Sequence, residues 1–299
     1  YMQRTEKIWF NGKFVPWDEA NTHVMTHALH YGTAVFEGIR MYKTARGSAI
    51  FQLNRHVDRL FYSAESIGLQ IPYTEQQITA AIIETTQINK MVECYIRPII
   101  YYGFEELKVT PKNCPTEIAI AVWPWGAYLK NDLVRVFIPD IIRLHPLTSV
   151  VDAKISGHYV NSMLAGREAM KKGFDEALLL DYEGNIAEGP GENFFMIKDS
   201  KVITPTTNSI LPGITRSSIL TLAANLGYQV EERSIKRDEA YSADECFFTG
   251  TAAEITPICS IDDMAMKYHC GPITTRLKEN FVKITRGENE NYACWLTII

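Results

Sequence analysis

Strand-like and helical segments follow one another irregularly along this chain, and their order limits the folds open to it. Asn11-Gly12 joins two short apolar runs, which is a strong β-hairpin signal, and a further hairpin is expected to turn near Asp199-Ser200. Between these hairpins, "HVDRLFYSAESIGL" has the apolar spacing of a helix. A doubly wound sheet requires regular strand–helix–strand units. The order therefore predicts an α+β fold.

The chain length predicts more than one domain. A chain of 299 residues is too long for one small core and favours two domains or one large unit. The segment "GAYLKNDL" interrupts the strand pattern near the middle. We expect a small N-terminal α+β domain over residues 1–128, a linker over 129–137, and a large C-terminal α+β domain over 138–299 that carries Lys154.

Composition excludes several classes of protein. The net charge is −5 and no basic block occurs, so neither nucleic acid nor an acidic membrane surface is an expected partner. No apolar run is long enough to span a bilayer, and the N-terminus lacks a signal-peptide pattern. The six cysteines form no CxxC pair, which favours reduced thiols in a cytoplasmic protein. The seven histidines show no metal-ligand spacing, so no metal is expected; His27 and His30 are interpreted as core or interface residues.

Lys154 lies among small and apolar residues in "VVDAKISGHYVNSM". Burial disfavours the charged form of a lysine, and a neutral amine is a nucleophile that can form a Schiff base. The alternative is an ordinary lysine whose head reaches the solvent. The stretch by itself leaves both open.

Two acids lie four residues apart in the turn "NIAEGPGENFF". Glu188 or Glu192 could pair with a buried cation or a protonated ring nitrogen. The alternative is a solvated turn glutamate. Two acids beside small turn residues and a Phe-Phe strand are unusual for plain surface, but the turn by itself leaves both interpretations open.

Two segments have the features of anion sites. Pro212-Gly213 precede a helix expected to begin near Ile214 or Thr215, and a helix N-terminus offers N–H groups to an anion. The small-residue turn around Thr251 and Ala252 could also face a phosphate or carboxylate. A helix cap and a turn without a ligand are the alternatives.

Arginines add to this set. Arg59 in "HVDRLF" and Arg97 in "CYIRPII" each interrupt an apolar pattern. A guanidinium suits planar recognition of phosphate or carboxylate, although a surface arginine is the alternative for each. Nucleotide-binding glycine motifs and the GxSxG elbow are absent from the sequence.

Together these residues match what pyridoxal 5'-phosphate needs: a lysine for its aldehyde, an acid for its ring nitrogen and donors for its phosphate. The chain resembles the branched-chain amino-acid aminotransferases, which are class IV aminotransferases with the two-domain fold-type IV architecture and the cofactor between the domains. The matching segments follow the family's order from about Trp9 to Pro257. They are "HALHYGTAVFEGIR", "HVDRL", "YIRP", "WPWGAYL", "AKISGHYVNS", "AEGPGENFF", "LPGITR" and "GTAAEITP".

The resemblance implies roles toward the cofactor. Lys154 would form a Schiff base with pyridoxal 5'-phosphate and then move a proton between substrate and cofactor. Glu188 would bond the ring nitrogen, and Tyr159 would bond the phenolic oxygen. The residues implied for the phosphate are Arg59, Ile214, Thr215 and Thr251.

The resemblance also implies roles toward the substrate. Tyr95, supported by Arg97, would meet the substrate carboxylate together with the backbone of Thr251 and Ala252. Arg40 would take the distal carboxylate of glutamate. The residues implied for the apolar side-chain pocket are Phe36, Gly38, Trp125 and Tyr128, and those implied to come from a neighbouring subunit are Tyr31 and Val109.

The implied reaction is ping-pong transamination between the branched-chain L-amino acids leucine, isoleucine and valine and 2-oxoglutarate, which yields L-glutamate. The enzyme would be a homo-oligomer, a dimer at least, with a hexamer as a larger option. The alternatives within this fold are a D-amino-acid aminotransferase or an aminodeoxychorismate lyase, with side activity on (R)-amines also open. A non-catalytic binding protein of the same fold would be expected to lack Lys154, which is present.

Overall fold

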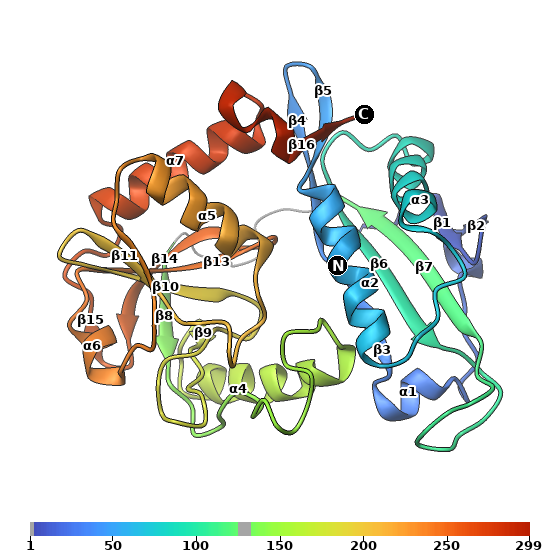
Figure 1. Ribbon diagram of the computed structural model, residues 1–299, viewed down its shortest axis with the longest axis horizontal. Helices are drawn as coiled ribbons and strands as arrows, with labels where there is room; N and C mark the ends of the chain where they lie inside the picture. Colours follow the sequence, from blue (N-terminus) through green and yellow to red (C-terminus); the bar gives the residue numbers. More distant parts are fainter. Residues whose placement is uncertain (1–2, 125–132) are drawn as a thin grey trace. The chain divides into compact units, whose positions relative to one another are not determined.

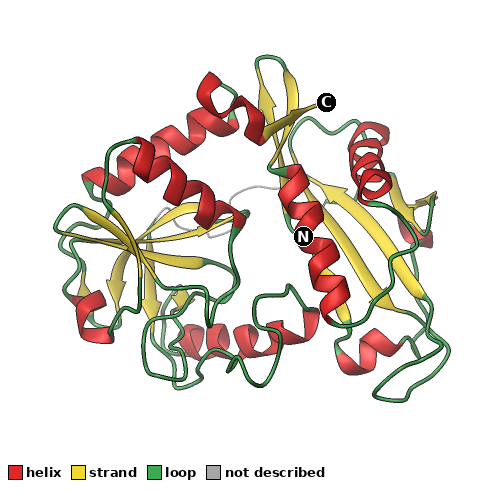
Figure 2. Cartoon of the chain, viewed as in Figure 1, coloured by secondary structure: helices red, strands yellow, loops and turns green. Residues whose placement is uncertain are grey.

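The computed structural model describes residues 3–124 and 133–299, and their contacts divide the chain into two units (Figure 1). The first unit is built from Tyr1–Gly126, Ala153–Gly157 and Lys283–Ile299, and the second from Ala127–Asp152 and His158–Val282. Each unit combines helices with one mainly antiparallel sheet (Figure 2). The expected α+β class is therefore confirmed.

The first sheet has the strand order β16-β5-β4-β6-β7-β1-β2, with β3 paired to β6. The hairpin at Asn11-Gly12 is confirmed, because both residues have positive φ and join β1 to β2. The run around Phe36 is split in two by Glu37 and Gly38. The strands are β1 (Lys7–Phe10), β2 (Lys13–Pro16), β3 (Ala34–Phe36), β4 (Ile39–Thr44), β5 (Gly47–Phe51), β6 (Cys94–Tyr102), β7 (Thr116–Trp123) and β16 (Leu296–Ile298).

Two long helices of the first unit pack their apolar faces into its core. α2 (Leu53–Ser66) buries Val57 and Leu60, and α3 (Glu75–Ile88) buries Ile78 and Ile82. Thr74 is the N-cap of α3 in a capping box with Gln77. A short helix, α1 (His27–Tyr31), precedes β3.

The second sheet has the order β12-β11-β10-β13-β14-β8-β9, with β15 paired to β14. The hairpin at Asp199-Ser200 is confirmed, since it joins β10 to β11 with both residues at positive φ. Stacked Phe195 and Phe247 rings lie on adjacent strands. The strands are β8 (Val134–Phe137), β9 (Glu176–Ala177), β10 (Asn193–Lys198), β11 (Lys201–Thr204), β12 (Val230–Glu232), β13 (Glu245–Gly250), β14 (Glu254–Ile261) and β15 (Met264–Ala265).

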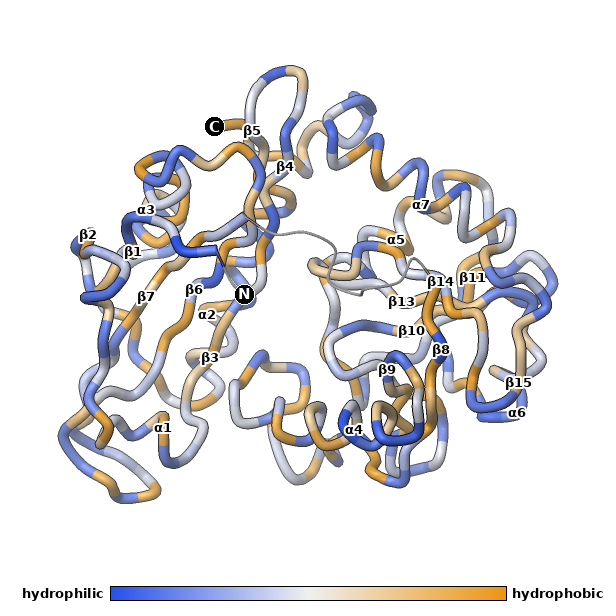
Figure 3. The backbone as a smooth tube through the Cα atoms, turned by 180° about the vertical axis from the view of Figure 1, so that it is seen from behind, coloured by the Kyte–Doolittle hydropathy of each residue, from blue (hydrophilic) through white to orange (hydrophobic). Residues whose placement is uncertain are grey.

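Helix α7 (Pro272–Thr285) presents apolar residues to one side and polar residues to the other. In Figure 3, α7 carries hydrophobic and hydrophilic segments in alternation along its turns, and its Leu277, Phe281 and Ile284 are buried. The helices of the second unit are α4 (Tyr159–Lys171), α5 (Ile214–Asn225), α6 (Arg237–Tyr241) and α7, whose end from Lys283 onward belongs to the first unit. None of the helices in the described part of the chain combines the length and apolar character that a membrane span requires.

The contacts divide the chain differently from the expected 1–128, 129–137 and 138–299. The segment Ala153–Gly157, which contains Lys154, belongs to the first unit. It is held there because Gly157 N–H donates to Gly32 O (3.1 Å) and Ile155 forms a bridge with Val35. A Cβ on Gly32 would lie 2.8 Å from the Gly157 Cα, so this approach needs glycine. Of the expected linker, Val134–Phe137 forms β8, and residues 129–132 lie outside the described residues.

Candidate active site

The backbone of Lys154 is fixed on both sides within the first unit. Its N–H donates to Ser63 Oγ (2.9 Å), and its carbonyl accepts from the Phe36 N–H (3.2 Å). Its Nζ lies 5.0 Å from the centroid of the Phe36 ring, and the residue is half-buried. The amine is therefore presented from a rigid support against an aromatic face.

Arg59 is held by a buried carboxylate. Its Nε and Nη2 donate to the two oxygens of Glu37, at 2.6 and 2.9 Å, and His56 Nδ1 lies 2.7 Å from Glu37 Oε2. The Glu37 side chain is 0% exposed and that of Arg59 is 13% exposed. The residues of α2 that face this site, His56, Arg59 and Ser63, are three and four positions apart and share one face of the helix.

Burial and charge oppose each other in this cluster. Burial alone would raise the pKa of Glu37, but the Arg59 charge and the His56 bond outweigh it, and the pKa falls well below its ordinary value of 4.5. Burial lowers the pKa of His56 below its ordinary 6.5, and the bond to Glu37 opposes this only in part. Glu37 is thus an ionised acceptor, and His56 Nδ1 carries the hydrogen that it donates.

A polar and aromatic wall lies beside Lys154 in the same unit. The Arg97 guanidinium carbon lies 4.6 Å from the Phe36 ring centroid, and Arg97 Nη2 donates to the Tyr95 hydroxyl at 3.2 Å. A Cβ on Gly38 would lie 1.9 Å from that hydroxyl oxygen, so only glycine fits under Tyr95. The structure therefore brings Phe36, Gly38, Tyr95 and Arg97 together.

Other predicted substrate residues also lie on the first unit, and Arg40 pairs with Tyr95 across β4 and β6. The Arg40 guanidinium carbon lies 5.1 Å from the ring centroid of Tyr42. Tyr31 is 43% exposed and donates through its hydroxyl to Leu107 O, and Val109 is 73% exposed. Trp125 and Tyr128 lie outside the described residues.

Glu188 is the centre of a buried cluster in the second unit. It accepts from Arg143 Nε (2.5 Å), from Asn193 Nδ2 (3.1 Å) and from the Leu211 N–H. Asn193 Nδ2 also donates to Leu211 O at 2.9 Å, which ties the turn of Glu188 to the loop before α5. The acid is therefore fixed in direction by three donors.

The N-terminus of α5 lies next to this cluster. Gly213 is its N-cap, and a Cβ there would lie 1.9 Å from Asn193 Oδ1. Ile214 and Thr215, the first helical residues, are both buried, and the first N–H groups of a helix have no acceptor within it. The sequence prediction of a helix start here is confirmed.

The remaining predicted residues of the second unit are at turns and helix starts. Thr251 and Ala252 form the half-buried turn between β13 and β14, and Tyr159 is the first residue of α4. Glu192, the other turn acid, is buried, and its Oε2 accepts from the Gly191 N–H.

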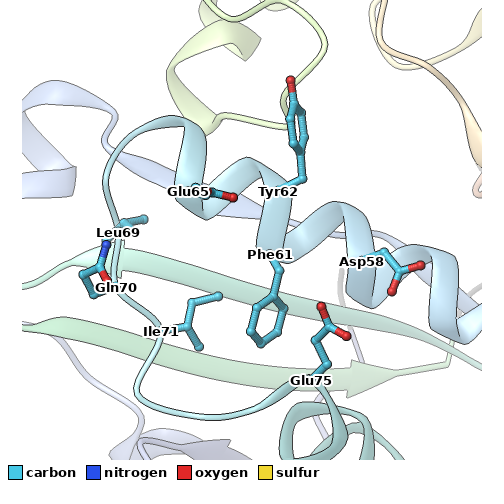
Figure 4. Close-up of a pocket in the computed structure, with 8 residues that line it drawn as sticks. All are labelled: Asp58, Phe61, Tyr62, Glu65, Leu69, Gln70, Ile71 and Glu75. Carbon is cyan, nitrogen blue, oxygen red and sulfur yellow. The ribbon is translucent and has the colours of Figure 1, made fainter.

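A surface pocket of about 490 Å³ on the first unit involves none of the predicted site residues. Figure 4 shows its lining, in which the Phe61 ring lies between Ile71 and Glu75. Asp58, Phe61 and Glu65 are three and four positions apart on a face of α2 different from that of Arg59. The carboxylates are exposed and solvated, so this pocket has no feature of a catalytic site.

Comparison with known proteins places the chain in a family. Residues 34–261 match the model of amino-transferase class IV. A branched-chain-amino-acid aminotransferase of Pseudomonas aeruginosa is 44% identical over 297 residues, covering 98% of this chain and 97% of the relative. The structure of a T.th. branched-chain amino acid aminotransferase with N-(5'-phosphopyridoxyl)-L-glutamate superposes with a TM-score of 0.95, 43% identity and 99% coverage of both chains. The Thermobaculum terrenum enzyme in its PLP-form gives a TM-score of 0.93 and 36% identity, with 98% coverage of both chains.

The chain belongs to the class IV aminotransferases, and it has their fold-type IV architecture. Within that class it is a branched-chain-amino-acid aminotransferase, and its cofactor is pyridoxal 5'-phosphate.

The residues present fit this cofactor. The first unit offers a supported amine at Lys154 and a guanidinium at Arg59. The second offers a fixed acceptor at Glu188 and a helix N-terminus at Ile214 that suits an anion. Gly213 lies close against Asn193, and this contact joins the Glu188 acceptor to the helix N-terminus at Ile214.

Sequence reasoning missed several residues that shape the site. Glu37, His56 and Ser63 support Arg59 and Lys154, while Arg143 and Asn193 support Glu188. One signal was available: Glu37 is an acid between the apolar residues of "VFEGI". The partners of Glu37 and Glu188 are 19 to 45 residues away along the chain, except for Asn193, so local patterns do not pair them.

Proposed function

We propose that this chain transfers the amino group of branched-chain L-amino acids to 2-oxoglutarate by a ping-pong mechanism, with Lys154 as the residue that bonds to the cofactor's aldehyde. The observation that carries the proposal is that two cationic side chains contact the same Phe36 ring. The Lys154 amine and the Arg97 guanidinium both contact this ring, and Arg97 bonds Tyr95. An amine nucleophile therefore lies beside an apolar and cationic wall suited to an amino acid.

Each residue has a role that its surroundings support. Bound pyridoxal 5'-phosphate supplies an electron sink for the negative charge that develops at the substrate Cα. Lys154 moves the Cα proton, and its backbone bonds to Ser63 and Phe36 fix the path of the amine. Glu188 holds a ring N–H by accepting its hydrogen bond, with Arg143 and Asn193 fixing the carboxylate. Arg59 and the N-terminus of α5 bind phosphate oxygens.

The substrate wall suits both donor and acceptor. Tyr95, oriented by Arg97, binds the α-carboxylate that both share. Phe36 gives apolar contact to an aliphatic side chain, and the Cβ-free Gly38 gives room to the Tyr95 hydroxyl beside it. Arg40 provides the charge for the distal carboxylate of 2-oxoglutarate or L-glutamate. The amino donor leaves as keto acid before the acceptor binds, so a single wall serves both half-reactions.

The proposed assembly is a homo-oligomer, a dimer at least. Support comes from Tyr31 and Val109, which are exposed apolar residues on the first unit. An exposed apolar group becomes favourable when a second copy covers it. The proposed compartment is a reducing cytoplasm, supported by six free cysteines.

The visible absorption spectrum of the purified holoenzyme tests this function. L-Leucine without a keto acid is expected to convert the yellow form to the near-ultraviolet pyridoxamine form. Lys154→Ala is expected to abolish this conversion while keeping part of the cofactor binding, and Lys172→Ala, an exposed lysine, serves as control. A protein that ignores L-leucine but responds to D-alanine would contradict the L-specific proposal. Near-normal turnover by Lys154→Ala would contradict the role of Lys154.

A further inference from the structure

The Arg59 guanidinium is paired with a buried carboxylate that cancels its charge. A free arginine would attract a phosphate more strongly than this pair. Glu37 nevertheless takes both Nε and Nη2, at 2.6 and 2.9 Å, in a side chain that is 0% exposed. Attraction of an anion does not explain why Arg59 is paired with a carboxylate, whereas a need to orient its guanidinium does.

A guanidinium has two edges that can bond a two-oxygen acceptor. Glu37 bonds the Nε–Nη2 edge through both of its oxygens, which fixes the direction of the opposite Nη1–Nη2 edge. Without the carboxylate, the flexible side chain would lose rotamer freedom when it binds an anion. Because the carboxylate already orders the Arg59 side chain in the folded protein, this entropy is lost on folding and not on cofactor binding.

Glu37 is in turn fixed from a second side. His56 Nδ1 donates to Oε2 at 2.7 Å, and the Gly38 N–H contacts the same oxygen at 3.3 Å. His56 and Arg59 both come from α2, whereas Glu37 comes from the link between β3 and β4. The cluster therefore locks α2 to the strand link of Glu37 and Gly38, which directly follows Phe36 at the end of β3.

We propose that Glu37 and His56 are positioning residues that aim the Arg59 guanidinium at the cofactor phosphate. This inference rests on the proposed function, which assigns Arg59 to that phosphate. Glu37 acts through Arg59 and touches neither substrate nor cofactor in this role. Its loss weakens cofactor retention far more than it changes the chemistry of the amino-acid substrate.

Cofactor release from the holoenzyme is the measurement that tests this inference. Glu37→Gln keeps the shape of the side chain but turns one acceptor into an N–H₂ donor, which repels the Arg59 donors. We expect its pyridoxal 5'-phosphate dissociation constant, measured by ultrafiltration and absorbance, to rise about tenfold to a hundredfold. Glu93→Gln, which removes an exposed partner of Arg286, is the matched control and is expected to stay within about twofold of the parent.

A double-mutant cycle separates positioning from a general loss of structure. Arg59→Lys removes the planar fork, so Glu37→Gln is expected to add less than about threefold to its effect. His56→Gln is a milder variant that leaves the Glu37 charge in place. We expect it to raise the dissociation constant by about threefold to tenfold in the parent background and not in the Arg59→Lys background.

The phosphorus NMR signal of the bound phosphate gives a second readout. It is expected to shift in Glu37→Gln and to keep the parent position in Glu93→Gln. Unchanged cofactor retention in Glu37→Gln would overturn the inference. It would also be overturned if the double variant Glu37→Gln/Arg59→Lys raised the dissociation constant by the full product of the two single effects. These outcomes are independent of the response to L-leucine, so a failure of the proposed function is distinguished from a failure of this inference.

Discussion

The direction of the Arg59 side chain depends on a residue far from it in sequence. The place of Arg59 in an apolar helix pattern left an anion-binding role and a surface arginine both open, and the family resemblance assigned it to the phosphate. Its direction is set by Glu37, 22 residues earlier, and Glu37 is fixed by His56. Sequence patterns identify the chemistry of such a residue, whereas its partner depends on how a helix packs against a strand link. For the same reason Arg143 was not predicted as the partner of Glu188.

His56 is expected to give the protein a pH-dependent stability. Its pKa falls on folding because of burial, so the unfolded chain binds the proton more tightly and acid favours unfolding. The contribution of His56 is therefore fully present above its ordinary value of 6.5 and is lost as the pH falls below it. The lowered pKa of Glu37 acts in the same direction, but its contribution to stability is fully present above its ordinary 4.5 and is lost only below that value. Between pH 6.5 and 4.5, the loss of stability on acidification therefore comes from His56 and not from Glu37.

Urea unfolding across this interval measures the effect. We expect the free energy of unfolding of the parent to fall between about pH 7.5 and 5.5, and that of His56→Gln to fall less. His269→Gln, a variant of an exposed histidine, is the control and should follow the parent. Equal slopes for His56→Gln and the parent would show that His56 takes up a proton within the folded protein.

Arg40 is expected to discriminate between the two substrates. Because 2-oxoglutarate has a distal carboxylate and leucine has none, Arg40→Gln should raise the Michaelis constant for the keto acid about tenfold and change that for leucine less than about twofold. Steady-state kinetics with each substrate varied in turn measures both constants. Arg46→Gln, on the exposed turn between β4 and β5, is the control. Equal losses for both substrates would contradict the distal-carboxylate role.

At the scale of elements, local signals predicted those parts whose geometry is local. The turn at Asn11-Gly12 was predicted, and the capping box at Thr74 is equally local, since turn and cap residues act on their own neighbours. The first residue of α2 could not be predicted as well from its local sequence. It begins at Leu53, earlier than the expected segment, after Gln52 in a left-handed conformation. Gln52 N–H donates to Trp295 O, a contact between distant parts of the chain that no local pattern contains.

Helix α7 is stabilised by a buried acid from a strand. Glu245 on β13 accepts from the Ile273 and Thr274 N–H groups, at 3.1 and 2.7 Å, and is 2% exposed. A carboxylate at a helix N-terminus satisfies free N–H groups and interacts favourably with the helix dipole. A Cβ on Gly271 would lie 2.1 Å from Glu245 Cδ, so the fit is close.

Replacing this acid should destabilise the protein without changing its chemistry. We expect Glu245→Gln to lower the free energy of unfolding by about 1.5–3 kcal/mol, since it loses a charge-assisted bond in a buried site. Chemical denaturation measures the loss. Glu279→Gln, on the exposed side of α7, is the control and should change stability by less than about 0.5 kcal/mol. A loss as small as that of the control would mean that the two N–H bonds contribute little.

At the scale of the whole molecule, the chain path was harder to predict than the residues. The sequence predicted two α+β parts, but contacts assign Ala153–Gly157 and Lys283–Ile299 to the first unit. Strand β16 pairs with β5, and Ile299 packs against the first core. Such returns of the chain follow from tertiary pairing, which short-range patterns do not encode. Lys154 is accordingly supported by residues of the first unit, although it lies midway along the sequence.

The proposed sharing of residues between subunits makes a quantitative prediction. If each site uses its own Lys154 and the neighbour's Tyr31, then Lys154→Ala and Tyr31→Ala damage a site from different chains. A mixed dimer contains one site with neither change and one site with both. Random pairing makes about half of the dimers mixed, so about a quarter of all sites are intact.

Co-expression of the two variants with different affinity tags tests this sharing. Mixed dimers purified through both tags are expected to recover leucine transamination to about half of the parent activity per dimer, because one of two sites is intact. Lys154→Ala paired with Lys154→Ala/Tyr31→Ala is the control, since no arrangement of these chains gives an intact site. Recovery in the first pair alone requires that Tyr31 act across the interface, because a Tyr31 that serves its own chain leaves every site damaged in both pairs.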